Sequence, residues 1–402
     1  MRLARKGFEI SPYVDPSAKT GTAPRDSDRN PGYPSIMEKL RATPAAGAIY
    51  LKDGEDLYTA GDWLVQERLA DTLQQLADAG GLDFYDGDIG QSIAGYLESH
   101  EGFISADDLR NYRIDDLEPL FGEYRGFQVA STPAGSGAHL IEMLQILDHL
   151  DPAELDHNSP GYIDTVSRVF RATFADNVAL KCMDFREAAP LERDIIALER
   201  AAAWAERIAG GDRVVVRSGE AVSGTTHLSA IDEQGNVVTF THSVGALGGS
   251  GVVAPELGFM FNDFLGHFNP LPGHANSISP GKKMVGGAPA ILFRDGQPHI
   301  IIGAPGGSRI LTAMTQTIVN AIDHKMDLER AVSVLRFHSE EDQLIFVEPE
   351  LEALVAGPLA DMGNEVQPSS YMSRVQAIRV GGDGELEAGS DPRAEIGIGR
   401  HP

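Results

Sequence analysis

The sequence predicts an α+β layered sandwich, because helix-like and strand-like patterns occupy different halves of the chain. Through most of the first 224 residues, apolar side chains recur three and four positions apart, as one face of a helix requires. After about residue 224 the pattern changes to alternating residues with hairpin turns. Helices, then strands, then a helix, without regular strand–helix alternation, favour separate layers over a parallel sheet.

In the first half, the apolar period predicts several helices. They span residues 63–76, 88–99, 138–150 and 160–180. Ser105, followed by Asp107 and Asp108, is a typical helix start. The run ERAAAWAERIAGGD ends in glycines, where a helix would stop. Residues 15–35 are rich in Pro, Gly, Ser and Asp, which predicts an exposed loop or a poorly ordered arm.

In the second half, two hairpins are predicted. HLSAIDEQGNVVTFTHSV alternates around the turn Gln234-Gly235-Asn236, which predicts two strands folded back on each other. The apolar runs APAILF and HIIIGA flank a turn that contains Asp295-Gly296. The run ILTAMTQTIVNAID then returns to a helical period.

Composition limits the class of protein. A chain of 402 residues with 42% hydrophobic content can bury a sizeable core. The formal net charge of −26 disfavours nucleic acid and anionic membranes as partners, because like charges repel. The single cysteine, Cys182, excludes an internal disulfide and a thiolate metal cluster, and a buried, inert thiol is expected.

The start of the sequence carries no recognisable targeting segment. MRLARKGFEISPYVD lacks the apolar region of a secretory signal, and no run approaches the roughly 18 apolar residues of a membrane span. As written, the chain is expected in the cytoplasm. An extracytoplasmic location is the expectation if the true start lies upstream.

Thr225 is the candidate nucleophile, in the run Ser223-Gly224-Thr225-Thr226-His227 between the two halves. Threonine is a weak nucleophile and needs a base, which its own α-amino group supplies once the residue becomes a chain terminus. That amine titrates near about 8, close to working pH. It exists only if the Gly224–Thr225 bond is cut, which the Thr225 hydroxyl could do by attacking the Gly224 carbonyl.

Several long motifs in order resemble the gamma-glutamyltransferase family of N-terminal-nucleophile hydrolases. TTHLSAIDEQGNVVTFT, GSGVVAPELGFMFND, GAPGGSRILTAMTQTIVNAID, RFHSEE and AGSDPRAE resemble the small catalytic subunit. The run from DGEDLYTAGDWLVQERLADTL to SADDLRNYR, together with STPAGSGAHLIEMLQIL, resembles the large subunit. The resemblance implies a four-layer αββα sandwich. It divides the chain into a large-subunit-like, mainly helical part (1–224) and a small-subunit-like catalytic part (225–402).

The resemblance also assigns catalytic roles. Thr225 falls on the residue that cuts the chain after Gly224 and then accepts the acyl group. Ser243 falls where the family has a second threonine that orients the nucleophile. Gly306 and Gly307 match the pair whose backbone amides form the oxyanion hole, and glycines let N–H groups approach a developing oxyanion closely.

Positions that hold the glutamate head group in the family are altered. Gly245 stands where an asparagine is expected, and Phe264 and His267 fall where an acidic or amide residue and an aspartate hold the α-amino group. The run VGGA, with Gly286 and Gly287, replaces the Ser-Ser pair that binds the α-carboxylate. Because a substrate ammonium would lack its charge partner, these changes argue against γ-glutamyl compounds as substrates.

The resemblance begins part-way through the family's large subunit, so the first elements and a substrate-binding arginine are not matched. An upstream start, a separate gene for the missing part, and a decayed relative are the alternatives. Arg186, in DFREAAP, looks like that arginine's motif but stands in the wrong order along the chain. The expected partners are a small amide or peptide-like substrate, the second fragment of the same chain, and a further copy or a missing N-terminal partner.

Two functions of different classes follow. The first is an autoprocessed amidohydrolase or acyltransferase that acts through a Thr225 acyl-enzyme. The alternative is an inactive, truncated relative that serves as a binding or assembly module. No cofactor is expected, and no metal is expected because His227, His242, His267 and His338 lack ligand spacing with each other.

Overall fold

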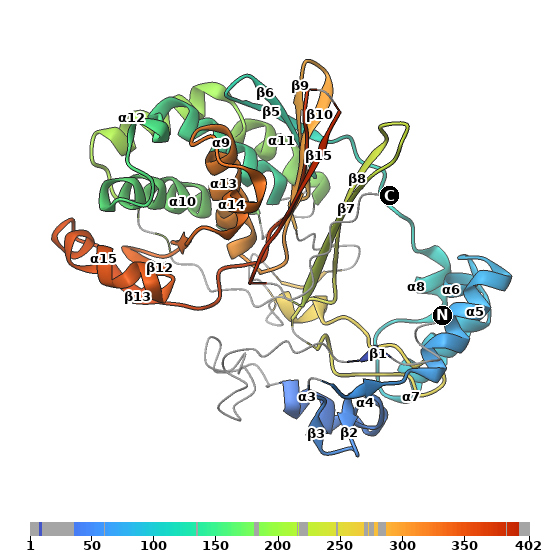
Figure 1. The fold of residues 1–402 in the computed structure, drawn as a ribbon. Coiled ribbons are helices and arrows are strands. Elements are labelled where there is room, and N and C mark those ends of the chain that lie inside the picture. Colours follow the sequence, from blue (N-terminus) through green and yellow to red (C-terminus); the bar gives the residue numbers. More distant parts are fainter. Residues whose placement is uncertain are drawn as a thin grey trace. The chain divides into compact units, whose positions relative to one another are not determined.

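The computed structural model describes residues 8–9, 36–59, 61–133, 136–180, 185–214, 216, 224–246, 248–268, 272, 277–279, 287–382 and 384–393. The chain divides into two compact units. Unit 1 contains residues 1–116 and 244–263, and unit 2 contains residues 117–243 and 264–402. Figure 1 shows the elements of both units.

Unit 1 is built from short elements around small apolar clusters. Its helices are α3 (Ile36–Ala42), α4 (Pro44–Tyr50), α5 (Glu67–Ala79), α6 (Asp83–Asp86), α7 (Asp88–Ser99) and α8 (Ala106–Asn111). Its paired strands are β1 (Phe8–Glu9) with β4 (Trp63–Leu64), and β2 (Leu51–Lys52) with β3 (Asp56–Leu57). Helix α8 begins with a capping box, in which Ser105 and Asp108 each accept a hydrogen bond from the other's backbone N–H.

A six-stranded sheet is the centre of unit 2, in the order β15-β14-β10-β9-β6-β5 with every pairing antiparallel. Its strands are β5 (Leu120–Tyr124), β6 (Phe127–Ser131), β9 (Ala290–Arg294), β10 (Gln297–Gly303), β14 (Gln376–Val380) and β15 (Leu386–Ser390). At the β9–β10 turn, Asp295 and Gly296 both have positive φ (51° and 75°), as this two-residue hairpin turn requires.

Helices of unit 2 cover one face of this sheet, as Figure 1 shows for α9 and α13. The helices are α9 (Ser136–Leu150), α10 (Pro160–Leu180), α11 (Phe185–Ile195), α12 (Leu198–Ala209), α13 (Arg309–Ile322), α14 (Leu328–Ser333) and α15 (Pro349–Asp361), with short 3-10 turns η2 (Pro152–Glu154) and η3 (Phe264–His267). A small sheet follows α14, formed by β11 (Phe337–His338), β12 (Leu344–Val347) and β13 (Glu365–Pro368). The main hydrophobic core lies between the helices and the six-stranded sheet.

The opposite face of the sheet carries a second, two-stranded sheet. Strands β7 (Thr225–Ile231) and β8 (Val237–Ser243) pair along their whole length and pack against β10 and β14. Their turn is held by Asp232, whose carboxylate accepts from the backbone N–H groups of Gln234 and Asn236. The described residues thus supply a helical layer and two sheet layers, and the α+β sandwich class is confirmed.

The structure agrees with most of the predicted elements, since the helices at 88–99 and 160–180, the Ser105 helix start and both hairpins lie where the sequence places them. The helix predicted over 63–76 was wrong at its start, because Trp63 and Leu64 pair with β1 and the helix begins at Glu67. This long-range pairing overrides a continuous apolar period.

The described residues before 224 are mainly helical, as predicted, but they also contribute strands to the central sheet of unit 2. Strands β5 and β6 come from this part and complete the central sheet beside β9. Their turn is Arg125-Gly126, with φ of 50° and 77°. Arginine is not one of the residue types that favour a positive φ, so the sequence does not indicate a turn at this position. Tertiary contacts hold it there, because the Arg125 guanidinium pairs with Asp323 and Asp151, both at 2.7 Å.

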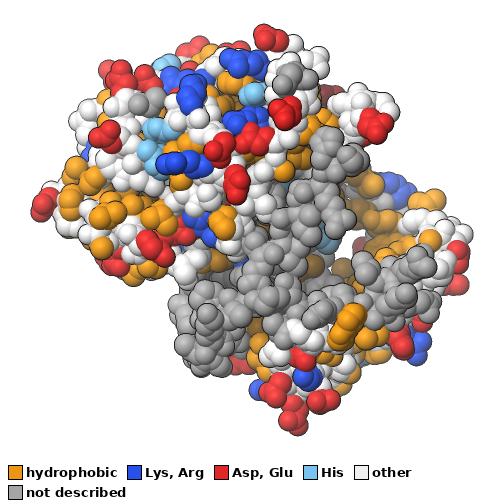
Figure 2. All heavy atoms as spheres, in the orientation of Figure 1, with side chains coloured by type: hydrophobic (Ala, Val, Ile, Leu, Met, Phe, Trp, Pro, Cys, Tyr) orange, Lys and Arg blue, Asp and Glu red, His pale blue; other side chains and the backbone are white. Residues whose placement is uncertain are grey.

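Several predicted features lie outside the described residues. These are the arm at 15–35, Cys182, Gly286 and the side chain of Arg186. In the described parts of the chain, no helix is both long and apolar enough to cross a membrane. Figure 2 shows acidic side chains scattered over one face of the molecule, in keeping with the net charge of −26.

Candidate functional site

Thr225 and Ser243 stand opposite each other at the open end of the β7–β8 hairpin. They are the first residue of β7 and the last of β8, and their Cα atoms are partners in the ladder. The Thr225 Oγ1 and Ser243 Oγ atoms lie 2.9 Å apart, within hydrogen-bond distance. The structure therefore brings the predicted nucleophile and its predicted orienting hydroxyl together.

Ser243 also reaches the peptide bond that would be cut. Its hydroxyl donates to the Gly224 carbonyl oxygen over 3.5 Å. Because a hydroxyl has one hydrogen, this arrangement has the Thr225 hydroxyl donating to Ser243 and the Ser243 hydroxyl donating to Gly224. The same side chain can take a proton from the nucleophile and polarise the adjacent carbonyl.

His227 continues the polar row two residues along β7. Its ring nitrogens lie 3.0 Å from Thr241 Oγ1 and 3.1 Å from Ser229 Oγ. Burial lowers the pKa of His227 to about 4, so the ring is neutral at physiological pH. A neutral, hydrogen-bonded ring of such low basicity organises the hydroxyl row and is poorly suited to act as a general base.

The end of β10 lies against this row. A Cβ added to Gly303 would come within 2.1 Å of the His227 ring, and Thr239 Oγ1 donates to the Ile302 carbonyl at 3.4 Å. Ile302 thus contacts Thr239, and the next residue of β10, Gly303, contacts His227, whose partner on β8 is Thr241. Strands β8 and β10 run the same way here, so β10 ends at the edge where β7 begins.

Gly306 and Gly307 leave β10 at that edge and lead into α13. Both have positive φ, 146° and 64°, and Gly306 is buried. Among the described residues, neither glycine N–H donates a hydrogen bond. Ser308, which follows, has a buried hydroxyl without a partner among those residues. Amide donors at the start of a 14-residue helix can stabilise a developing negative charge.

The predicted substrate-binding positions are distributed differently. Gly287 packs against Thr241 of β8, since a Cβ at Gly287 would come within 2.8 Å of the Thr241 Cγ2 atom. Phe264 begins η3 and is partly buried, and His267 ends it. Gly245 is buried, has a φ of 90°, and belongs to unit 1. Of these positions, Gly287 is the one whose described contacts place it against the hydroxyl row, at Thr241.

Sequence reasoning missed the inner hydroxyls Ser229, Thr239 and Thr241, and the packing of His227 on Gly303. The sequence did contain an indication, because these residues occupy alternate positions of the two predicted strands and so point to the same face as Thr225 and Ser243. Alternation predicted the strands but did not by itself say which face was buried.

Comparison with known proteins gives a family. The family model described as "Gamma-glutamyltranspeptidase" matches residues 1–399. The chain belongs to the gamma-glutamyltranspeptidase family. The glutathione hydrolase proenzyme of Escherichia coli (strain K12) is 31% identical over 419 residues, which cover 98% of this chain and 69% of that protein. The acylase ACY 1 proenzyme of Pseudomonas sp. (strain V22) is 30% identical, with 98% and 68% covered.

Solved structures agree with this assignment at the level of the fold. The cephalosporin acylase from Bacillus halodurans aligns with a TM-score of 0.78 over 98% of this chain and 72% of that chain, at 23% identity. By its family and by its glutathione hydrolase and acylase relatives, this protein is a gamma-glutamyltransferase-like hydrolase, and the solved structure shares its fold. The alternative of a non-catalytic binding or assembly module is not favoured.

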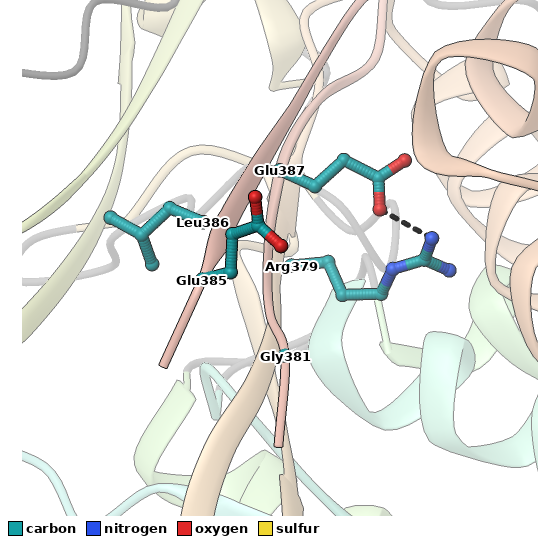
Figure 3. Close-up of a pocket in the computed structure, with 5 residues that line it drawn as sticks. All are labelled: Arg379, Gly381, Glu385, Leu386 and Glu387. Carbon is teal, nitrogen blue, oxygen red and sulfur yellow. Dashed lines mark ion pairs between the residues drawn. The ribbon is translucent and has the colours of Figure 1, made fainter. Parts of the chain in front are cut away.

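A separate hollow in unit 2 lies at the β14–β15 hairpin (Figure 3). It measures about 400 Å³ and is lined by Arg379, Gly381, Glu385, Leu386 and Glu387. Arg379 pairs with Glu387 across it, and Glu387 also accepts from a backbone N–H at the start of α14. These contacts join the hairpin to α14. Among the described residues, no group of three or more His, Cys, Asp or Glu side chains could hold a metal ion.

Proposed function

We propose that this enzyme cuts its own chain between Gly224 and Thr225 and then uses Thr225 as an N-terminal nucleophile on amide substrates. The observation that carries the proposal is the position of Ser243. Its Oγ lies 2.9 Å from Thr225 Oγ1 and 3.5 Å from the Gly224 carbonyl oxygen, so nucleophile and target are bridged by one hydroxyl.

In the cleavage step, Thr225 Oγ1 attacks the Gly224 carbonyl carbon and passes its proton toward Ser243. The Gly224–Thr225 C–N bond breaks, the Thr225 nitrogen takes up a proton, and an ester joins Gly224 to Thr225 Oγ1. Water then hydrolyses this ester, which leaves a Gly224 carboxylate, a free Thr225 hydroxyl and an α-amine. The product is a heterodimer of fragments 1–224 and 225–402.

In turnover, the freed α-amine accepts the proton of the Thr225 hydroxyl as Oγ1 attacks the substrate carbonyl. The Gly306 and Gly307 N–H groups stabilise the oxyanion of the tetrahedral intermediate. The amine returns its proton to the leaving nitrogen, and the acyl group stays on Thr225 as an ester. Water releases the acid by the same proton path, and an amine acceptor in its place would give transfer.

The substrate class that fits best is an amide whose acyl part carries no α-ammonium. Phe264 stands where a negative or amide side chain would face an ammonium, and glycines stand where hydroxyls would bind a carboxylate. A buried charge left without a partner costs about 1–3 kcal/mol or more. The relatives include proteins named glutathione hydrolase and acylase, and the altered positions favour an acylase-like substrate over a γ-glutamyl compound.

Three p-nitroanilides that differ stepwise in the acyl chain test this choice. γ-L-Glutamyl-p-nitroanilide carries both head-group charges, glutaryl-p-nitroanilide lacks the amine, and pentanoyl-p-nitroanilide lacks both. We expect kcat/KM to be at least about tenfold higher for one of the last two than for the first, which corresponds to about 1.4 kcal/mol. A γ-glutamyl preference would overturn the substrate class while leaving the nucleophile in place.

A substituted pair sharpens the test. Phe264→Glu should raise the rate with the γ-glutamyl compound relative to the pentanoyl compound, because it restores a charge partner. Leu265→Glu, a change at a half-exposed neighbour, is the matched control and should leave the ratio unchanged.

Acid-quenched reactions with pentanoyl p-nitrophenyl ester should show the acyl mass on the peptide that begins with Thr225. Turnover with the acyl group on another residue would contradict the assigned nucleophile.

A further inference from the structure

The loop before β14 packs directly against the start of the Gly306–Gly307 turn. The Ser373 hydroxyl donates to the Pro305 carbonyl oxygen at 2.7 Å, and the Arg374 backbone N–H donates to the same oxygen at 3.3 Å. Ser373 is buried, with 2% of its surface exposed. One carbonyl thus accepts two hydrogen bonds from consecutive residues of a distant segment.

This carbonyl shares a peptide plane with the Gly306 N–H. In a planar trans peptide the C=O of one residue and the N–H of the next point in opposite directions. Fixing the Pro305 oxygen against Ser373 and Arg374 therefore aims the Gly306 N–H away from that loop. We infer that Ser373 is a positioning residue that sets the direction of the Gly306 oxyanion donor, an inference that rests on the function proposed above.

The fit between the two segments is tight on both sides. A Cβ at Gly306 would come within 2.7 Å of Ser373 Oγ and 3.0 Å of its Cα. Ser373 has a φ of 66°, a left-handed conformation that costs energy for any residue with a Cβ. The strained serine and the required glycine are in direct contact, so the loop and the turn constrain each other.

Other contacts hold the loop without the Ser373 hydroxyl. Arg336 donates to the Met372 carbonyl at 3.4 Å and pairs with Asp391 at 2.6 Å. The Asp391 carboxylate also accepts from the Val375 backbone N–H at 2.9 Å. Because this buried pair anchors the loop at both ends, removing the Ser373 hydroxyl should loosen the Pro305 carbonyl, which keeps the Arg374 N–H as a donor, without unfolding the loop.

The expected effect is on the transition state and not on ground-state binding. Loss of a whole oxyanion donor costs about 10²–10³ in kcat. Ser373→Ala leaves the Arg374 N–H in place, so kcat should fall by about tenfold with little change in KM, as for an interaction made only in the transition state. Ser373→Gly should lower kcat equally, while its conformational freedom at positive φ preserves or raises stability.

The experiment uses the full chain with glutaryl- and pentanoyl-p-nitroanilide, and the inhibitor butylboronic acid, whose tetrahedral adduct with a hydroxyl mimics the intermediate. In Ser373→Ala and Ser373→Gly, the boronate Ki should rise by the factor by which kcat/KM falls. Ser250→Ala is the matched control, because this hydroxyl also donates to a partly buried backbone carbonyl, that of Phe261 at 2.9 Å, but in unit 1. It should leave kcat and Ki unchanged.

The outcomes separate the two proposals. If the wild type cuts itself and turns over, but both Ser373 variants keep its kcat and Ki, the positioning role is wrong and the proposed function stands. If Ser373→Ala loses activity only in proportion to a lower melting temperature, while Ser373→Gly retains both, the role is structural and the inference is wrong. A wild type that neither cuts itself nor turns over removes the proposed function, and this inference with it.

Discussion

The two faces of the β7–β8 hairpin are chemically reversed relative to an ordinary half-buried strand pair. Apart from the pair Ile231 and Val237 next to the turn, the face toward β10 carries hydroxyls and one imidazole, from Thr225, His227, Ser229, Thr239, Thr241 and Ser243. Beyond the exposed pair Thr226 and His242 at the open end, the outer face carries the large apolar side chains Leu228, Val238 and Phe240, which are 50%, 50% and 48% exposed. In most such hairpins the apolar set would face the neighbouring sheet.

This difference teaches where the chemistry lies. Burying polar groups is costly unless each is hydrogen-bonded, and here the inner residues satisfy one another across the two strands. The outer residues make no comparable network and supply β propensity. Substitutions on the inner face should therefore lower the free energy of unfolding strongly, and equivalent substitutions on the outer face should change it little.

The largest effect is expected at the contact between the inner face and β10. Gly303→Ala would place a methyl group within 2.1 Å of the His227 ring, so the ring must leave its hydroxyl partners. We expect a loss of about 3 kcal/mol or more in the free energy of unfolding, measured by urea denaturation. Gly357→Ala, in α15 with open space around it, is the control and should stabilise the protein slightly. Equal effects of the two changes would contradict the packing.

The next effect is a pH dependence from His227. Its folded pKa of about 4 lies below the unfolded value of 6.5, so the unfolded chain binds more protons between these values. The stabilisation from the neutral ring is present above about pH 6.5 and is lost as the pH falls toward 4, by on the order of 2–3 kcal/mol. His227→Gln, which does not titrate, should lack this slope when the two are compared by denaturation. Parallel pH profiles would show that the ring is not buried neutral.

Thr241→Val should have a smaller effect. The substitution conserves shape but leaves His227 Nδ1 without its partner at 3.0 Å. A buried group left without a hydrogen bond costs about 1–3 kcal/mol. Thermal denaturation at pH 7 would measure the loss, and a neutral result would mean that water replaces the hydroxyl.

The reciprocal change on the outer face should have the smallest effect. Val238→Thr adds a hydroxyl to a half-exposed position on the same strand. Because valine and threonine both suit a strand, we expect a change within about 0.5 kcal/mol. A loss as large as that of Thr241→Val would indicate that this face is covered in the folded protein.

Much of the fold could be predicted from local patterns. Polar turns such as Gln234-Gly235-Asn236 and Asp295-Gly296, and the capped helix start at Ser105, have local causes, and the structure places them as expected. Where long-range contacts decide, local reading failed: Trp63 joined a strand through pairing with β1, and Arg125 occupies a turn position that its ion pairs with Asp151 and Asp323 maintain.

The candidate site was predictable only in part. Motif order placed Thr225, Ser243 and the glycine pair, and the structure brings Thr225 and Ser243 into contact. The roles of Gly303 and Ser373 could not be predicted, because each depends on a contact between segments far apart in the chain. A glycine at the end of an apolar strand gives no indication that a ring fills the space of its missing side chain.

The most direct test of the whole account is the intact mass of the purified protein, by denaturing electrophoresis and mass spectrometry, beside a Thr225→Ala variant. We predict two fragments in the wild type, divided between Gly224 and Thr225, and one uncut chain in the variant. A single uncut wild-type chain after long incubation, or a cut at another bond, would contradict Thr225 as the nucleophile that the Ser243 hydroxyl prepares.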